Sequence, residues 1–125
     1  MLAVFAAGRI LQPEGGRRQV IGATTMGAGG ALLEKLAVDP RRGLFVDHDL
    51  TGTTSSSMPT FRKEVIFMDE SDPMSSPMKA KGVGEFGLCG VAAAIANTIH
   101  NAKDIPVRHY RITLDKLING LPMVA

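Results

Sequence analysis

The segment Lys81–Gly87 constrains this chain most, because three of its seven residues are glycine and an apolar helical pattern follows directly. Glycine lets a backbone pass close to another group and adopt positive φ angles that other residues rarely adopt. Glu85 stands just before the predicted helix, near the positive end of its dipole. A carboxylate fixed on a stiff turn, facing a cavity, suits general-base chemistry. A simple helix cap is the other interpretation, since short glycine-rich turns are common.

The bulk composition is that of one soluble globular domain, with 125 residues, 45% hydrophobic and 21% charged. The net charge of +2 gives no electrostatic reason to expect nucleic acid as a partner. The longest apolar run, 88–96, is too short to span a bilayer, so no membrane association is expected. No signal peptide is recognised, which favours a cytoplasmic location. Export to the periplasm together with a signal-bearing partner is the alternative.

The first third of the chain predicts a buried strand followed by a glycine-rich helix. Leu2–Ile10 is short and mostly apolar, and Gln12–Gly16 has the composition of a turn. Arg17–Leu36 has helical spacing, and its four glycines each weaken a helix by roughly 1 kcal/mol relative to alanine. We therefore expect this helix to approach another backbone or a ligand closely. Its predicted apolar face consists of Ile21, Ala28, Leu32 and Leu36, with Thr25 as a polar member.

The glycines of this helix also raise a nucleotide-binding hypothesis. Gly27–Leu32 has part of the spacing of the dinucleotide fingerprint. Leu32 stands where that fingerprint requires glycine or alanine, and no strand leads directly into the segment. The hypothesis is therefore disfavoured, and equilibrium dialysis with NAD or ATP would test it.

The middle of the chain predicts short elements joined by loops. Asp39–Gly43 is a turn, and Leu44–Val46 is a candidate short strand. Asp47-His48-Asp49 carries metal-competent side chains, but a polar turn is favoured because no other His or Cys stands at ligand spacing. Leu50–Pro59 is a predicted loop. Phe61–Met68 follows as a strand whose second half is buried, and Asp69–Ala80 is another long loop.

After Glu85 the sequence predicts an amphipathic, alanine-rich helix. Its apolar positions are Leu88, Val91, Ala92, Ile95, Ala96 and Ile99. Cys89 falls inside this pattern and is expected to be a small core residue. As the single cysteine, it excludes an internal disulfide and a cysteine-based zinc site. His100 lies in the last turn, where we interpret it as structural, and Asn101 is the expected stop.

The last predicted elements are a strand over Val107–Ile112 and a short helix over Leu114–Ile118, with Thr113 as its N-cap. The fold class is therefore α+β. A few-stranded sheet is expected to pack on the glycine-rich helix and on the alanine-rich helix.

Two motifs occur together in this chain: a KGVGE turn before the alanine-rich helix, and GAGGAL further upstream. The segment KGVGEFGLCGVAAAIANTIHNAKDIPVRHYRITLDKLI resembles the C-terminal end of the molybdenum-binding subunit of the xanthine dehydrogenase and aldehyde oxidase family. The upstream VFAAGRILQP and GATTMGAGGALLEKLAVDPRRGLFVDHDL look like the segment that precedes it. Within this family, the chain looks like the bacterial aldehyde oxidoreductases of the periplasmic type.

This resemblance implies a catalytic role for Glu85. In the family, the glutamate of this turn is the general base that takes the proton from a molybdenum-bound hydroxyl, whose oxygen then attacks an aldehyde or an N-heterocycle. Lys81, Gly82, Val83, Gly84 and Gly87 match the turn around it, and the resemblance implies that the first four of these residues bind the cofactor.

The resemblance also assigns cofactor-binding positions to the glycine-rich helix. Gln19 matches a family glutamine that touches the cofactor, and Met26 and Gly27 fall at further cofactor-binding positions. Met26 departs from the family, because many members have glutamine there and a thioether cannot replace an amide as donor and acceptor. The loop 51–58 lacks the usual tyrosine, and Ser57-Met58-Pro59 lacks a common aspartate.

The implied cofactor is molybdopterin, in its cytosine dinucleotide form, with 2Fe-2S clusters and FAD on partner subunits. Family molybdenum subunits are several times longer than this chain. Residues 1–125 are therefore expected to be a C-terminal fragment of the molybdopterin-binding domain, inactive without the rest of the subunit. The alternative is a non-catalytic truncated remnant, with only a structural or interaction role and with exposed apolar surface on the strand Leu2–Ile10.

Overall fold

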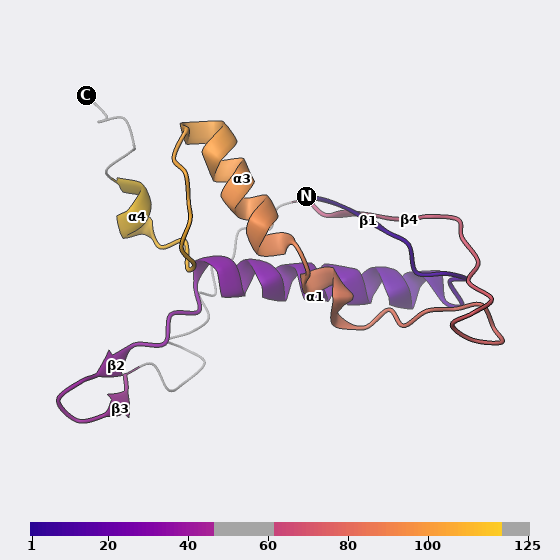
Figure 1. Ribbon diagram of the computed structural model, residues 1–125, viewed down its shortest axis with the longest axis horizontal. Helices are drawn as coiled ribbons and strands as arrows, with labels where there is room; N and C mark the ends of the chain where they lie inside the picture. Colours follow the sequence, from indigo (N-terminus) through magenta and orange to yellow (C-terminus); the bar gives the residue numbers. More distant parts are fainter. Residues whose placement is uncertain (47–61, 119–125) are drawn as a thin grey trace. The chain divides into compact units, whose positions relative to one another are not determined.

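The computed structural model describes residues 1–46 and 62–118. The described chain divides into two compact units, the first from residues 1–26 and 62–89 and the second from residues 27–46 and 90–118. The predicted Asp47-His48-Asp49 turn and the loop 50–59 lie outside the described residues. Helices and short two-stranded sheets are combined, so the α+β prediction is confirmed (Figure 1).

The sheet of the first unit pairs β1 (Leu2–Phe5) with β4 (Glu64–Phe67) in parallel, with Leu2 opposite Glu64 and Phe5 opposite Phe67. Alternate residues point to opposite faces of a strand. Phe5 and Phe67 lie on the half-buried face, whereas Val4 on the other face is 51% exposed. The predicted strand over Leu2–Ile10 was therefore wrong in extent and burial. The strand predicted over Phe61–Met68 is also shorter, and Met68 is exposed.

Helix α1 (Pro13–Leu32) begins four residues earlier than predicted, inside the expected turn. Proline is well tolerated in the first turn of a helix, and Glu14 there complements the helix dipole. The side-chain carbonyl of Gln12 accepts a hydrogen bond from the backbone N–H of Gly15. The proline and glycines at 13–16 therefore start a helix rather than a turn.

The buried face of α1 is not the one that the apolar residues indicated. The buried positions are Val20, Ala23, Thr24, Gly27, Ala28 and Ala31. They recur at helical spacing, and all but Val20 are small or polar, so a pattern of large apolar residues cannot reveal them. Ala28 was predicted correctly, whereas Ile21 and Leu32 are only half-buried. The hydroxyl of buried Thr24 donates to the Ile21 carbonyl at 2.9 Å.

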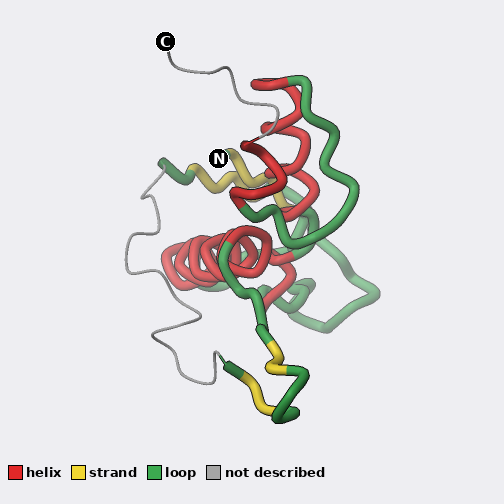
Figure 2. Tube along the Cα trace, turned by 90° about the vertical axis from the view of Figure 1, so that its left-hand side faces the viewer, coloured by secondary structure: helices red, strands yellow, loops and turns green. Residues whose placement is uncertain are grey.

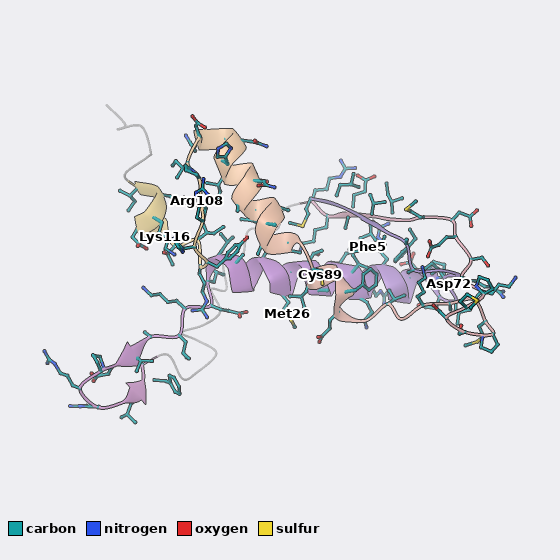
Figure 3. The ribbon with its side chains drawn as sticks, in the orientation of Figure 1. Phe5, Met26, Asp72, Cys89, Arg108 and Lys116 are labelled. Atoms are coloured by element: carbon teal, nitrogen blue, oxygen red, sulfur yellow. The ribbon has the colours of Figure 1, made fainter. Side chains whose placement is uncertain are left out.

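The segment after the long loop 69–80 forms a 3-10 helix, η1 (Glu85–Leu88), and then helix α3 (Val91–Lys103). Gly90, at φ +82°, separates them, so the single predicted helix is interrupted. Cys89 lies at this break and is exposed, which corrects its assignment to the core (Figure 3). The apolar face of α3 is as predicted, with Val91 buried. His100 lies in the last turn, 3.6 Å from the Asp104 carboxylate, and the helix ends two residues after Asn101.

The second unit also contains a hairpin of β2 (Val38–Asp39) and β3 (Leu44–Phe45), and helix α4 (Leu114–Ile118). The strand predicted over residues 107–112 is absent. Ile112 is buried, and its N–H donates to the Ala31 carbonyl at 2.8 Å. The α4 bounds agree with the prediction. Figure 2 shows how short the strands are beside the helices and loops. None of the helices in the described ranges is long and apolar enough to cross a membrane.

Candidate functional site

A cavity of 510 Å³ lies within the first unit, beside the glycine-rich turn. We use that term for residues 81–87. Three segments form its walls: residues 9–12 after β1, the first two turns of α1, and residues 80–84 before η1. The lining residues are Arg9, Ile10, Leu11, Gln12, Gly15, Gly16, Gln19, Ala80, Lys81, Val83 and Gly84. A cavity of this size is in the range of small-molecule sites, about 300–1,000 Å³.

Four of the residues predicted to bind a cofactor, Gln19, Lys81, Val83 and Gly84, line this cavity together. Gln19 comes from α1, 62 positions before Lys81, so the fold unites two segments that the sequence keeps apart. Gly82 is exposed beside them. Glu85 follows Gly84 directly as the first residue of η1, and its side chain is exposed rather than part of the lining.

The downstream end of the glycine-rich turn is fixed by packing. Phe86 meets Phe5 of β1 edge to face, with ring centroids 4.4 Å apart and planes at 88°. Such aromatic pairs contribute about 0.5–1.5 kcal/mol beyond their buried area. Gly87 is buried against α1, where an added methyl group would lie 3.0 Å from Ala23 Cβ. The residue after Glu85 is therefore held by the sheet, and the next one by the helix.

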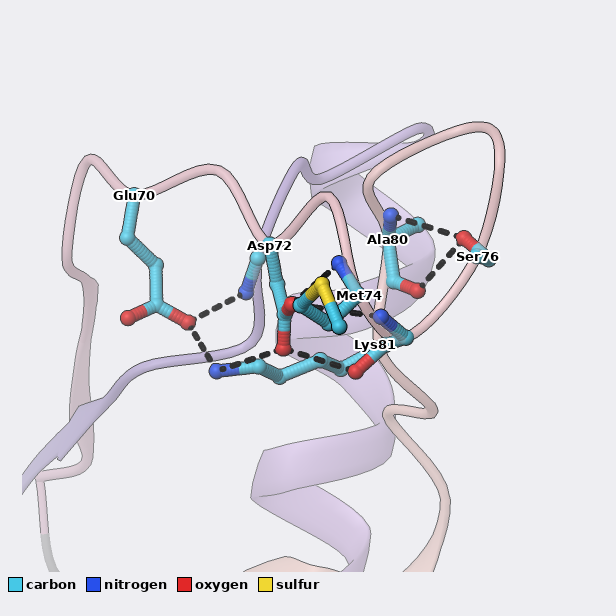
Figure 4. A network of polar contacts seen from close by, with 8 residues as sticks. Glu70, Asp72, Met74, Ser76, Ala80 and Lys81 are labelled. Atoms are coloured by element: carbon cyan, nitrogen blue, oxygen red, sulfur yellow. Dashed lines mark hydrogen bonds and ion pairs between the residues drawn. The ribbon is translucent and has the colours of Figure 1, made fainter.

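The upstream end is fixed by an ionic network around Lys81 (Figure 4). The Lys81 ammonium donates to Glu70 Oε1 at 2.5 Å and lies 3.6 Å from Asp72 Oδ2. The same Glu70 oxygen accepts the N–H of Gly8 at 2.8 Å. The carboxylate of Asp72 also accepts the Ser75 hydroxyl at 2.7 Å, which orders the loop 69–80. The Lys81 side chain predicted to bind the cofactor is thus already paired within the chain.

Mutual hydrogen bonding shifts the pKa values of these groups. The Lys81 ammonium, and then the Gly8 N–H, lower the pKa of Glu70 below its usual 4.5. The Ser75 hydroxyl and the Met74 N–H lower the pKa of Asp72. The Glu70 hydrogen bond raises the pKa of Lys81. All three shifts favour the charged forms.

The two remaining predicted positions, Met26 and Gly27, have other surroundings. Met26 is 55% exposed and projects from α1 without lining the cavity (Figure 3). Gly27 belongs to the second unit, where an added methyl group would lie 2.9 Å from Val91 Cβ. Its place in the described structure is explained by helix packing alone.

Several cavity residues were missed by sequence reasoning, notably Arg9, Gln12, Gly15 and Gly16. The glycine pair before the apolar pattern was the available signal, but it was interpreted as a turn. The partner of Lys81, Glu70, lies 11 residues away across an irregular loop, and no periodicity connects the two. No group of three or more His, Cys, Asp or Glu side chains suited to a metal ion occurs among the described residues.

Comparison with known proteins shows which proteins this chain is similar to. The sequence model described as a molybdopterin cofactor-binding domain matches residues 1–62. The chain is 62% identical to the aldehyde oxidoreductase molybdenum-binding subunit PaoC of Escherichia coli K12, over 99% of this chain and 17% of PaoC. It is 30% identical to the xanthine dehydrogenase molybdenum-binding subunit of Escherichia coli O157:H7, over 94% of this chain and 16% of that protein.

The fold agrees with these matches. The chain superposes on CO dehydrogenase from Oligotropha carboxidovorans with a TM-score of 0.79 at 19% identity, covering 94% of this chain and 15% of that one. The fold and sequence together therefore define a part of a molybdopterin-binding protein. The chain belongs to the family of molybdenum-binding subunits of xanthine dehydrogenases and aldehyde oxidoreductases, and it spans about one sixth of the length of these relatives.

Proposed function

We propose that this chain supplies one wall of a molybdopterin site and the general base, Glu85, of a molybdenum hydroxylase that oxidises aldehydes or N-heterocycles. The observation that carries the proposal is the position of Glu85 directly after Lys81, Val83 and Gly84, which line the 510 Å³ cavity. The 62% identity to the aldehyde oxidoreductase subunit PaoC supports an aldehyde as the first substrate to test.

The donors at the cavity fit a pterin with a phosphate-bearing tail. The Gln19 amide offers a donor and an acceptor for the edge of a pterin or a nucleobase. The Arg9 guanidinium can pair with phosphate in a bidentate manner. The backbone of Gly82 has open space beside it, since a methyl group added there would meet no described atom within 4 Å. These groups would hold the cofactor, and we propose its cytosine dinucleotide form.

The chemistry divides between the cofactor and this chain. When bound, the molybdenum cofactor supplies the oxygen and accepts the electrons. Glu85 Oε accepts the proton that is released as oxygen is transferred, and the anchored residues on either side fix the backbone from which the carboxylate extends. Among the described residues Glu85 is exposed, so the layer that excludes water from it comes from outside them. We assign that layer to the rest of the subunit.

The proposed assembly follows from the length of the relatives. The chain spans 17% of PaoC, so we propose that residues 1–125 form the C-terminal fragment of the molybdopterin-binding domain. Further partners are subunits that carry 2Fe-2S clusters and FAD and remove the electrons. Activity then requires the whole complex.

A chimeric subunit tests this function. In it, residues 1–125 replace the matching stretch of PaoC, and the chimera is produced with the other subunits of that enzyme. We expect aldehyde-dependent dye reduction by the chimera and a loss of kcat of about 10²–10⁴-fold in Glu85→Gln, the usual range for a general base. Glu34→Gln, at an exposed glutamate of the second unit, is the matched control and should keep full activity. Unchanged activity in Glu85→Gln would disprove the assigned role.

The alternative, a non-catalytic remnant, is favoured by one observation. Leu2, Val4 and Ile66 leave an apolar patch exposed on one face of the β1–β4 sheet, at 61%, 51% and 45% exposure. The chimera distinguishes the two functions. A folded chimera that binds molybdenum but oxidises no aldehyde or N-heterocycle would support the remnant.

A further inference from the structure

The Glu70 carboxylate connects three segments of the first unit that are far apart in the sequence. It comes from the loop after β4, and one of its oxygens accepts both the Gly8 N–H, at 2.8 Å, and the Lys81 ammonium, at 2.5 Å. Backbone hydrogen bonds reinforce the junction: Lys81 N–H donates to the Ala7 carbonyl at 3.1 Å, and Arg9 N–H to the Lys79 carbonyl at 2.8 Å. The side chains of Glu70 and Lys81 are only 31% and 35% exposed.

Gly8 makes this close junction possible. Its φ of +63° is in the left-handed region that favours glycine, and a methyl group there would lie 2.6 Å from the Lys79 carbonyl oxygen. The two segments that leave the junction form walls of the cavity, residues 9–12 on one side and residues 80–84 on the other. The Glu70–Lys81 pair therefore lies where the two walls meet.

The stretch between the two anchors of the glycine-rich turn has little support of its own. A methyl group added at Gly82 or at Gly84 would meet no described atom within 4 Å. Val83 is half-buried within the stretch and lies near Gly16 of α1, where an added methyl group would be 3.7 Å from Val83 Cγ1. The other contacts described for this stretch lie before it, at Lys81, and after it, at Phe86 and Gly87. The position of the Glu85 backbone therefore depends on both ends.

We propose that Glu70 and Lys81 are positioning residues for Glu85, and that the Lys81 ammonium serves the junction rather than contacting the cofactor. The inference rests on the proposed function of Glu85. The ion pair sets where the glycine-rich turn begins, and the packing of Phe86 sets where it ends. The backbone of Glu85 is then held at a fixed point beside the cavity, while its side chain is exposed.

The first test needs no cofactor. Amide hydrogen exchange is measured on the 125-residue chain at Gly8, Arg9 and Lys81, whose N–H groups donate within the junction. We expect exchange at these amides to rise at least about tenfold in Lys81→Met and Glu70→Ala, because the local opening becomes easier. Lys81→Arg should restore most of the protection, and Lys103→Met, at an exposed lysine of α3, should change nothing. Unchanged exchange in both Lys81→Met and Glu70→Ala would overturn the proposal.

The second test uses the chimeric subunit. A 1 Å displacement of a catalytic group can cost roughly 10²-fold, so we expect Lys81→Met and Glu70→Ala each to lower kcat about ten- to a hundredfold, with KM and molybdenum content unchanged. The double variant should be little worse than either single one, because both break the same pair. Lys81→Arg should recover activity. A loss of molybdenum in Lys81→Met but not in Glu70→Ala would overturn the proposal, because it would show direct contact with the cofactor.

The two proposals can fail separately. If Glu85→Gln keeps full activity, the function assigned to Glu85 fails, while the hydrogen-exchange result still decides whether the junction exists. If Glu85→Gln is inactive and the junction variants keep the kcat of the unmodified chimera, the positioning role fails and the function of Glu85 stands.

Discussion

Gly27 of α1 and Gly82 of the glycine-rich turn look alike in the sequence but have opposite surroundings. Gly27 is buried in the second unit, and a methyl group there would lie 2.9 Å from Val91 Cβ. Gly82, in the first unit, is exposed, and a methyl group there would meet nothing described within 4 Å. The first glycine is explained by the packing of this chain with itself. The second is unexplained by that packing, which is the condition expected where a cofactor approaches the backbone.

The comparison shows that glycine density alone does not locate a ligand site. The glycine run of α1 suggested close contact with a backbone or a ligand, and at Gly27 the contact is with a side chain of α3. Within the glycine-rich turn the surroundings of the glycines also differ, since Gly87 packs against Ala23 whereas Gly82 has open space beside it. Added volume at each position should therefore separate residues that stabilise the fold from residues that serve the site.

The largest expected effect on stability is that of Gly27→Ala. The new methyl group would collide with the Cβ of Val91, which cannot rotate away, and overpacking of this kind costs about 1–3 kcal/mol. Urea denaturation of the 125-residue chain, followed by circular dichroism, should show the corresponding fall in the free energy of unfolding. An unchanged midpoint would mean that α1 and α3 do not pack at Gly27 as described.

Gly82→Ala should have the next largest effect, on cofactor retention rather than on stability. With open space around it, the methyl group should leave the urea midpoint of the chain nearly unchanged. In the chimeric subunit it would enter the space proposed for the cofactor, and we expect the molybdenum content to fall about fivefold, equivalent to roughly 1 kcal/mol. Full molybdenum content, measured by plasma mass spectrometry, would place the cofactor elsewhere.

Gly22→Ala is the internal control and should stabilise the chain slightly. Gly22 lies inside α1, and a methyl group there meets no described atom within 4 Å. Alanine is favoured over glycine in a helix by about 0.5–1 kcal/mol. The same urea titration should show a higher midpoint. Destabilisation similar to that of Gly27→Ala would show that any side chain harms α1, and the contrast between packed and open glycines would be lost.

The smallest expected effect concerns acid stability. Because the pKa of Glu70 is lowered in the folded chain, the unfolded chain binds its proton first as the pH falls below about 4.5. Glu70 therefore contributes stability that is present above this pH and is lost as the pH falls through the folded pKa. In Glu70→Gln the dependence of the urea midpoint on pH below 5 should become shallower. An identical acid profile would show that the pair with Lys81 is not formed in solution.

Sequence reasoning succeeded where local patterns determine structure. The apolar face of α3, the bounds of α4 and the turn before Leu44 follow from spacing and from turn residues. Local patterns did not connect Gln19 with Lys81. The family resemblance placed both residues in one predicted site, and both line one cavity in the structure. The role of Glu85 itself stays a prediction.

The failures have a common cause, which is that the decisive interactions are not periodic. The buried face of α1 is built from small residues such as Ala23 and Ala31, which a hydrophobic pattern does not distinguish. Gly90 interrupts the helix that a continuous apolar pattern predicted, and this exposes Cys89. The bond between Lys81 and Glu70 depends on how the loop 69–80 folds back, which single-sequence spacing cannot show.

A structure of the chimeric subunit with its cofactor bound would test the central claim most directly. The measured quantity is the position of the Glu85 carboxylate relative to the molybdenum and to the Gly82 backbone. We predict that the carboxylate faces the metal centre, that the cofactor lies against Gly82, and that Lys81 is still paired with Glu70. A carboxylate directed into bulk solvent, with the cofactor bound away from the cavity, would contradict the account.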